Sequence, residues 1–362
     1  MTMARLLGKL VVYALLIGGA LIFLTPLLWM MATALKPIEQ TMSMPPSWVP
    51  YRYHAQVDGR EVPVKKGESY VEPRVVILRD GERVIVEPRN VIAETDQVLQ
   101  TIEASGAHPW LRVRPERPED GDWVVVPREE LRREVAPRWG NFSAAMVAMK
   151  HVPRYLKNTL VLCFLTVVGT VFSSALAAYG FSRIPWPGRN RVFIIALATM
   201  MIPFPVVMVP LYSLFKTLGW IGTLKPLWVG SFFAGAFNVF LLRQFFMTLP
   251  KDLSDAARID GCGEFRIFWQ IMLPLSRPAL MVVGLFQFMY TWNDFMGPLI
   301  YLTDQKDFTL ALGLQFFQSQ QGGTEWHYLM AASSLVVLPV IVLFFLAQRT
   351  FIEGISMTGL KG

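Results

Sequence analysis

Six long apolar runs constrain the fold of this chain more than any other feature of its sequence. Each is near 20 residues, the length at which an α-helix crosses a hydrocarbon core of about 30 Å. The composition agrees, since 53% of the 362 residues are hydrophobic, 17% are charged and the mean hydropathy is +0.39. The sequence therefore predicts an all-α polytopic membrane protein with six transmembrane helices. The runs are residues 10–34, 158–182, 192–215, 226–247, 277–302 and 328–348.

The first run could also be a signal peptide, because Arg5 and Lys9 precede its apolar stretch. The stretch is too long for that. We therefore expect residues 1–36 to form an N-terminal tail and an uncleaved first span.

The basic residues of the short loops predict the orientation of the spans. Lys and Arg are enriched in cytoplasmic loops, whereas long translocated segments largely escape this rule. With the N-terminus inside, both termini are cytoplasmic and the basic residues favour the inside by twelve to three. The twelve are Arg5, Lys9, Arg183, Arg189, Arg191, Arg243, Lys251, Arg258, Arg266, Arg277, Arg349 and Lys361, and the three are Lys216, Lys225 and Lys306.

A polar insertion separates the first two spans. Residues 35–157 hold 19 of the 34 basic and 18 of the 27 acidic side chains, so we expect 37–157 to lie outside the membrane, on its external side. Asp80-Gly81, between two short apolar runs, is typical of a β-hairpin turn, and Asp58-Gly59 and Asp120-Gly121 repeat this chemistry. The insertion is predicted to have a small β-rich core at about 51–137. It either contacts a solute-binding partner or the cell envelope, or it is a loop domain without such a role.

Residues 249–276, between spans four and five, predict two short amphipathic helices that meet at a glycine turn formed by Gly261 and Gly263. Ser254 or Asp252 is expected to cap the first helix. The small pair Ala256-Ala257 favours close approach to another protein over contact with lipid.

The second of these helices is predicted to carry one apolar face and to end at Pro274. The face is made of Phe265, Phe268, Trp269 and Met272.

This segment resembles the EAA coupling loop of ATP-binding-cassette (ABC) importer permeases. The matching residues are Asp255 to Gly261, which read Asp-Ala-Ala-Arg-Ile-Asp-Gly, and Leu273 to Pro278. Asp255 stands where that family usually has Glu, and Cys262 where it usually has Ala. Other short matches resemble the maltose-type carbohydrate permeases, in the second of their two permease subunits. They lie at 33–37, 158–160, 177–183, 201–203, 292–295 and 359–362.

The resemblance covers residues 1–50 and about 138–362, with a core permease region at 158–362, and it leaves out the insertion. It implies a subunit of the bacterial inner membrane that forms half of the pathway for a sugar, an oligosaccharide or a glycerol-phosphate. The implied partners are a second permease, two cytoplasmic ATPase subunits that bind ATP and Mg, an extracytoplasmic solute-binding protein and membrane lipid. The implied ATPase-coupling residues are Asp255, Ala256, Ala257, Arg258, Asp260, Gly261, Cys262 and Pro274.

No catalytic or cofactor site is predicted in the chain itself. Its nearest approach to a phosphate-binding loop, residues 354–361, has Leu360 where the lysine should stand. The histidines, His54, His108, His151 and His327, are too scattered for a metal site. Cys163 and Cys262 are expected on different sides of the membrane, without a mutual disulfide. The net charge of +7 does not form a basic stripe interleaved with aromatic residues, so no nucleic-acid partner is expected.

Asp294 is the one carboxylate inside a predicted span. An ionisable residue at this depth is costly and usually faces water or the protein interior. Trp292, Asn293 and Asp294 therefore either line the substrate pathway, with Trp292 stacked on a sugar, or form a helix-packing network.

Two other classes of function compete with the interpretation as an importer permease. A secondary transporter or channel without an ATPase often has inverted repeats and several buried ionisable groups, which this sequence lacks. An envelope sensor would need a cytoplasmic domain large enough to signal, and the predicted topology leaves no internal loop of that size. The coupling segment favours the importer over both.

Overall fold

The computed structural model divides the chain into two compact units, Met1–Trp139 and Gly140–Gly362. It describes residues 3–43, 46–57, 59–70, 74–79, 82–86, 97–102, 110–116, 123–127, 130–318 and 324–359.

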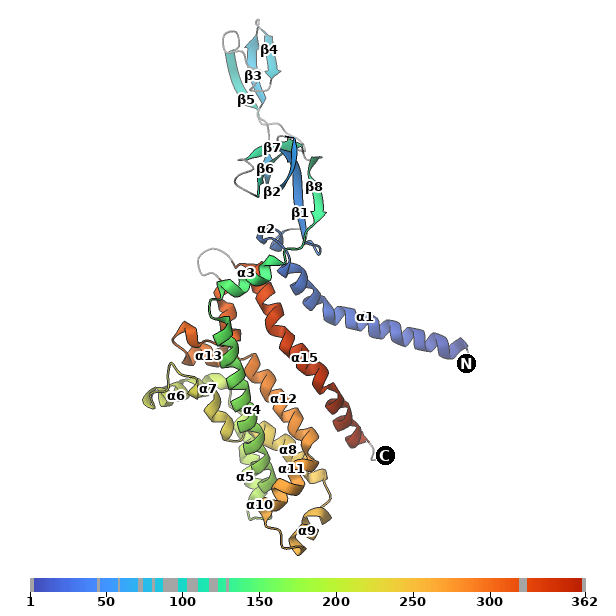
Figure 1. Ribbon diagram of the computed structural model, residues 1–362, viewed down its shortest axis with the longest axis vertical. Coiled ribbons are helices and arrows are strands. Elements are labelled where there is room, and N and C mark those ends of the chain that lie inside the picture. Colours follow the sequence, from blue (N-terminus) through green and yellow to red (C-terminus); the bar gives the residue numbers. More distant parts are fainter. Residues whose placement is uncertain are drawn as a thin grey trace. The chain divides into compact units, whose positions relative to one another are not determined.

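The first unit contains two helices and two antiparallel sheets (Figure 1). The five-stranded sheet has the order β7-β6-β2-β1-β8, and the three-stranded sheet has the order β4-β3-β5. The elements are α1 (Met3–Ala34), α2 (Ile38–Thr41), β1 (Tyr51–Val57), β2 (Arg60–Tyr70), β3 (Arg74–Arg79), β4 (Glu82–Val86), β5 (Gln97–Ile102), β6 (Trp110–Pro115), β7 (Val124–Pro127) and β8 (Arg132–Val135).

Two of the predicted hairpins are present. Strand β3 pairs with β4 from Val75↔Val86 to Arg79↔Glu82, and β1 pairs with β2 up to Val57↔Arg60. Gly59 closes the second hairpin with a φ of +76°, a backbone conformation that glycine adopts without steric cost. The Asp80-Gly81 and Asp120-Gly121 turns lie outside the described residues.

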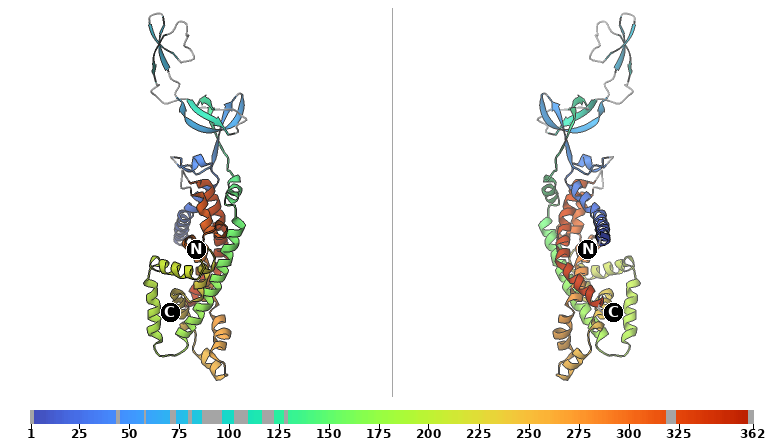
Figure 2. Two further views of the ribbon diagram at one scale, coloured as in Figure 1. Left: turned by 90° about the vertical axis from the view of Figure 1, so that its left-hand side faces the viewer. Right: turned by 90° about the vertical axis from the view of Figure 1, so that its right-hand side faces the viewer.

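The second unit is helical, with the long helix α4 packed against α8 and α12 (Figures 1 and 2). Its α-helices are α3 (Gly140–Ala148), α4 (Val152–Ser182), α5 (Arg189–Ala198), α6 (Phe204–Thr217), α7 (Lys225–Val229), α8 (Ala236–Thr248), α9 (Asp252–Ile259), α10 (Glu264–Ile267), α11 (Leu273–Leu275), α12 (Arg277–Trp292), α13 (Met296–Tyr301), α14 (Leu310–Gly313) and α15 (Trp326–Gly359). Small residues on α4, among them Ala175 and Ala178, are fully buried and permit this close packing.

Four helical segments among the described residues are long and apolar enough to cross a membrane, or up to six if two bent pairs each count as one span. The four are Gly8–Ala34, Val152–Ser182, Lys225–Thr248 and Trp326–Gln348. The number of spans thus lies between four and six, and the predicted six is its upper bound.

The other two predicted spans are not straight helices. Within 192–215 the chain bends by 95° between Met201 and Phe204, at Pro203, which has an extended backbone. Within 277–302 helix α12 ends at Trp292 and α13 begins at Met296. A second bend, of 80°, separates Glu264–Leu275 from α12. Hydropathy records the apolar run but not its breaks, whereas the prolines inside these runs, among them Pro203 and Pro298, are typical of bends.

Candidate functional site

Helix α9 is the first helix of the predicted coupling segment, and it ends in a Schellman motif. The Cys262 amide donates to the Ala257 carbonyl over 2.9 Å, the Gly261 amide donates to the Arg258 carbonyl over 3.0 Å, and Gly261 has a φ of +79°. The predicted glycine turn is therefore present at Gly261. Gly263 instead has an extended backbone, with a φ of −70°.

The two faces of α9 have different surroundings. Ser254 and Ala257 are 2% and 6% exposed, and Ala257 packs in the core cluster together with Cys262. Ala256, Ile259 and Asp260 are exposed. Of the predicted coupling residues, Ala257 and Cys262 thus pack inward, whereas Asp255, Ala256, Arg258, Asp260 and Gly261 are exposed.

The predicted cap of α9 is wrong. Lys251 occupies the N-cap position, and among the described residues no side chain caps this end. Asp252 is the first helical residue, and Ser254 lies inside the helix with a buried side chain, so neither occupies the position from which a side chain caps.

A polar network joins α9 to the membrane helices. Arg258 donates from Nη1 to Asp255 over 2.7 Å and from Nε to Glu264 over 2.8 Å. Glu264 also accepts a hydrogen bond of 2.5 Å from the hydroxyl of Tyr179, near the end of α4. Its carboxylate and the Asp255 carboxylate raise the pKa of the Arg258 guanidinium by hydrogen bonding and charge, despite some desolvation.

A second link fixes the end of α8, which leads into α9. The Arg183 guanidinium, at the C-terminus of α4, donates to the carbonyl oxygens of Phe246 and Leu249. A shift of α9 would therefore strain contacts at the ends of both α4 and α8.

The second helix of the segment differs from its prediction. Phe268 and Met272 are buried, whereas Phe265 and Trp269 are exposed and stack on each other with ring centroids 6.3 Å apart. The four residues do not form one apolar face, because a π-helical turn, Phe268–Met272, changes the helical spacing. Pro274 does not end the helix at its own position either: it is an exposed residue inside α11, which ends at Leu275.

Trp292, Asn293 and Asp294 lie where α12 ends. The Trp292 indole is 2% exposed, donates to the Val336 carbonyl of α15 over 3.1 Å and stacks on Phe288. Asn293 donates to the Met289 carbonyl, and Asp294 accepts from the Gly297 amide at the start of α13. These contacts favour the helix-packing interpretation. In this conformation the indole is not available to stack on a sugar.

The sequence reasoning missed several residues of this surface. Leu253 and Ile259 are exposed apolar residues on α9, with Ile259 87% exposed, and Tyr179, Arg183 and Glu264 form the links behind it. Leu253 and Ile259 are six residues apart, which is no helical repeat, so the pattern gave no signal for them. Glu264 could have been singled out, since an acidic residue directly after a glycine turn is typical of a helix start.

The remaining polar candidates do not gather into another site. Among the described residues, no three His, Cys, Asp or Glu side chains are placed to hold a metal ion, and His108 lies outside them. Cys163 and Cys262 are both free.

The family model described as binding-protein-dependent transport system inner membrane component matches residues 169–356, which lie wholly in the second unit and include the whole coupling segment. The chain belongs to this family. It is a multi-pass inner-membrane permease, as the sequence predicted, and the match does not favour a secondary transporter or channel that works alone.

Curated relatives align over much of their length. The arabinooligosaccharides transport system permease protein AraQ of Bacillus subtilis (strain 168) is 38% identical over 213 residues, 58% of this chain and 74% of the relative. The trehalose/maltose transport system permease protein MalG of Thermococcus litoralis is 35% identical over 213 residues, which cover 59% of this chain and 77% of the relative. The sn-glycerol-3-phosphate transport system permease protein UgpE of Yersinia enterocolitica is 34% identical over 237 residues, which cover 64% of this chain and 82% of the relative.

A solved structure shares the fold. A chain of a bacterial ABC transporter involved in the import of the acidic polysaccharide alginate has a TM-score of 0.61 and 16% sequence identity, covering 96% of this chain and 98% of that one. This likeness confirms the predicted fold class, a mostly helical membrane protein.

Proposed function

We propose that this chain is the permease subunit of an ABC importer for a carbohydrate, and that it forms half of the translocation pathway beside a second permease. The substrate class is a sugar, an oligosaccharide or a glycerol-phosphate. The names of the relatives support this class, since they transport arabinooligosaccharides, trehalose and maltose, or sn-glycerol-3-phosphate.

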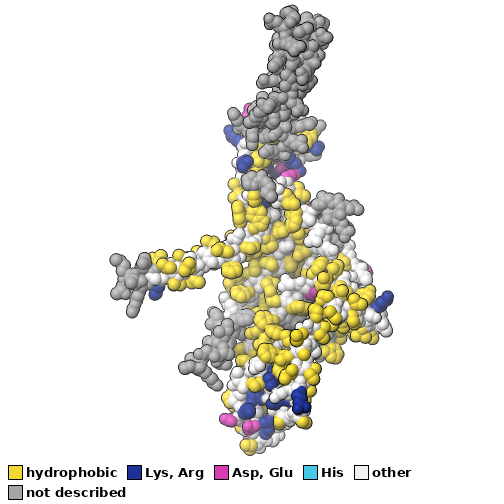
Figure 3. Space-filling view, turned by 180° about the vertical axis from the view of Figure 1, so that it is seen from behind, with side chains coloured by type: hydrophobic (Ala, Val, Ile, Leu, Met, Phe, Trp, Pro, Cys, Tyr) yellow, Lys and Arg dark blue, Asp and Glu magenta, His cyan; other side chains and the backbone are white. Residues whose placement is uncertain are grey.

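Two cytoplasmic ATPase subunits would bind ATP and Mg, and an extracytoplasmic binding protein would deliver the solute. In this arrangement the chain has six spans, counting each bent pair as one, and both termini in the cytoplasm. Residues 37–157 would then lie outside. Lys and Arg side chains gather at the end of the second unit that carries α9 and α10, below a largely apolar surface, which supports a cytoplasmic position for that end (Figure 3).

The outward face of α9 is the observation that carries the coupling role. This face presents Leu253, Ala256 and Ile259, and the exposed Asp260 and Gly261 follow directly after the helix. Exposed apolar groups at a polar membrane surface indicate a protein partner. A short helix whose small and apolar residues face outward fits a groove on another protein. Its inward ties through Arg258 and Glu264 to α4 would transmit a rigid-body movement of the ATPase to the spans.

Co-purification from detergent-solubilised membranes tests this proposal. Ala256→Arg places a long charged side chain on the outward face without touching a described hydrogen bond of a side chain, and Ala256→Ser is the matched control with a small side chain. A Gly261 substitution is unsuitable, because its positive φ would strain the loop itself. We expect an ATPase and a second permease to co-purify with the natural chain and with Ala256→Ser. Ala256→Arg should lose the ATPase and keep the permease. Absence of an ATPase with all three chains, or its retention by Ala256→Arg, would contradict the proposal.

A further inference from the structure

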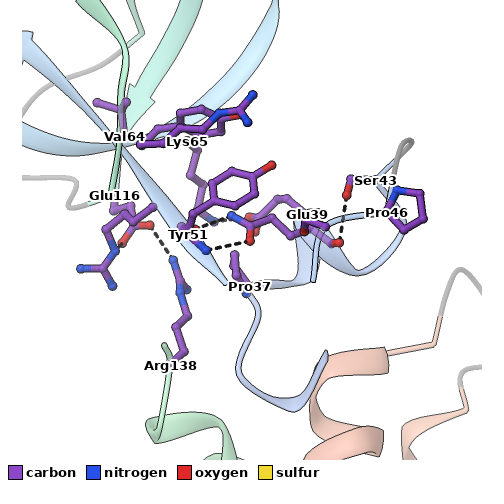
Figure 4. Close-up of a pocket in the computed structure, with 14 residues that line it drawn as sticks. Pro37, Glu39, Ser43, Pro46, Tyr51, Val64, Lys65, Glu116 and Arg138 are labelled. Carbon is purple, nitrogen blue, oxygen red and sulfur yellow. Dashed lines mark hydrogen bonds and ion pairs between the residues drawn. The ribbon is translucent and has the colours of Figure 1, made fainter. Parts of the chain in front are cut away.

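The first unit contains a cavity of about 480 Å³ that lies outside the family match (Figure 4). Its wall on one side is the segment around α2, with Glu39 and Ser43, and on the other side strands β1 and β2, with Tyr51 and Lys65. Glu116, after β6, completes the wall. This volume is in the range of small-molecule sites and exceeds that of a single sugar ring.

The two walls are joined by direct hydrogen bonds, so the cavity does not depend on a ligand to form. The Gln40 side-chain amide donates to the Tyr51 carbonyl and its oxygen accepts from the Tyr51 amide, over 3.2 Å in the second case. These two hydrogen bonds attach the Gln40 side chain of α2 to the backbone of Tyr51, the first residue of β1. A preformed cavity lowers the entropic cost of binding.

Both carboxylates of the cavity are paired. Glu116 accepts from Arg138 over 2.5 Å and lies 3.6 Å from the Arg52 guanidinium, and Glu39 lies 3.0 Å from the Lys65 ammonium (Figure 4). Each pair still leaves acceptor positions on the carboxylate, because a carboxylate has about four lone-pair sites.

Arg133, on β8, supplies a positive charge that these pairs do not balance. Its guanidinium carbon lies 5.1 Å from the centroid of the Tyr51 ring and 5.5 Å from that of Tyr53, and among the described residues no carboxylate pairs with it. The cavity lining contains Arg52, Lys65, Arg133 and Arg138 against Glu39 and Glu116, which gives 4 − 2 = +2. Stacking on aromatic rings leaves the edge of a guanidinium free to bind an anion with two parallel hydrogen bonds.

We propose that this cavity binds an anionic saccharide, whose negative group pairs with Arg133 and whose hydroxyls donate to Glu39 and Glu116. A simple anion would leave the remaining acceptor positions of Glu39 and Glu116 without donors, and a neutral sugar would make no charge-assisted contact with the exposed Arg133 guanidinium. An acidic sugar satisfies both kinds of group. Carboxylate and phosphate groups suit the guanidinium equally. The site belongs to the first unit and stands independently of the transport role.

Isothermal titration calorimetry on the full purified chain in detergent, at about 0.15 M salt so that unspecific attraction between exposed charges is screened, tests the site. The probes are trigalacturonate for the carboxylate, glucose 6-phosphate for the phosphate, maltotriose as a neutral sugar and inorganic phosphate as an anion without a sugar. We expect saturable binding of trigalacturonate or glucose 6-phosphate, and whichever binds identifies the anionic group. Maltotriose and inorganic phosphate should bind at least about tenfold more weakly.

The matched variants are Arg133→Gln and Arg132→Gln. Both side chains are exposed and lie on the same strand, but only Arg133 lines the cavity. Loss of a charge-assisted bidentate contact should weaken binding at least about tenfold in Arg133→Gln, and Arg132→Gln should stay within about twofold of the natural chain. Circular dichroism checks that both variants fold, and Arg133→Lys, which keeps the charge, should fall between them. Equal affinities of Arg133→Gln and Arg132→Gln, equal binding of maltotriose or inorganic phosphate, or no binding of either anionic sugar would each overturn the proposal.

Discussion

The hydrogen bond between Tyr179 and Glu264 should stabilise the coupling segment more than the ion pair between Arg258 and Glu264. The Tyr179 side chain is buried and its hydroxyl donates to a carboxylate over 2.5 Å. A hydrogen bond to a charged group contributes about 1.5–3 kcal/mol, and we reduce this to about 1–2 kcal/mol because the Glu264 side chain is 42% exposed. The Arg258 side chain is 36% exposed, so its pair with Glu264 should contribute about 0.2–1 kcal/mol.

Two double-mutant cycles separate these contributions. One combines Tyr179→Phe with Glu264→Ala and the other combines Arg258→Ala with Glu264→Ala. Tyr179→Phe removes only the hydroxyl and keeps the ring against Phe268, whose centroid is 5.3 Å away. The free energy of unfolding is measured in mixed micelles by titration with a denaturing detergent. A larger interaction energy in the Arg258 cycle than in the Tyr179 cycle would refute this reasoning.

Three further outcomes follow from particular residues. Gly261→Ala should destabilise the chain by about 1 kcal/mol because of its positive φ, whereas Gly263→Ala, at an extended backbone, should cost less; equal losses in unfolding measurements would contradict this. Trp292→Phe should lose about 1 kcal/mol of stability with its hydrogen bond to α15 but retain transport; loss of uptake at unchanged stability would instead support the pathway role. Burial acts to raise the pKa of Glu39, but hydrogen bonds from its own backbone amide and from Lys65 bring this pKa below the usual value. The Glu39–Lys65 pair therefore stabilises the protein at pH values above the pKa of an unfolded glutamate. That stabilisation is lost as the pH falls below about 4, and Lys65→Met should reduce the acid-dependent loss of thermal stability; an unchanged pH profile would show that the pair contributes nothing.

The long apolar runs predicted the helices well, because hydrophobic length is a property of the local sequence. Helix α4, predicted at 158–182, spans Val152–Ser182. Prolines inside the apolar runs, Pro203 among them, predicted bends but not their size, since a proline there is compatible with a kink, a break or a nearly straight helix. The bend at Ser276 was not predicted. Which of these occurs depends on neighbouring helices that one sequence does not reveal.

The coupling segment was predicted in outline and not in its faces. Gly261 followed from the chemistry of a tight helix end. The inward packing of Ala257 and Cys262 depends on where α9 meets the core, and the π-helical turn at Phe268–Met272 redirects side chains that a regular helix would align. Both are effects of tertiary packing, which hydrophobic periodicity does not detect.

Site-specific photo-crosslinking in intact membranes tests the central claim most directly. A photoreactive phenylalanine derivative is placed at Ile259 of α9, which is 87% exposed, and as a control at Val147 of α3, which is 76% exposed. The account predicts a covalent product with an ATPase subunit from position 259 and none from position 147. A product with an ATPase from position 147, or none from position 259 while the complex is intact, would contradict it.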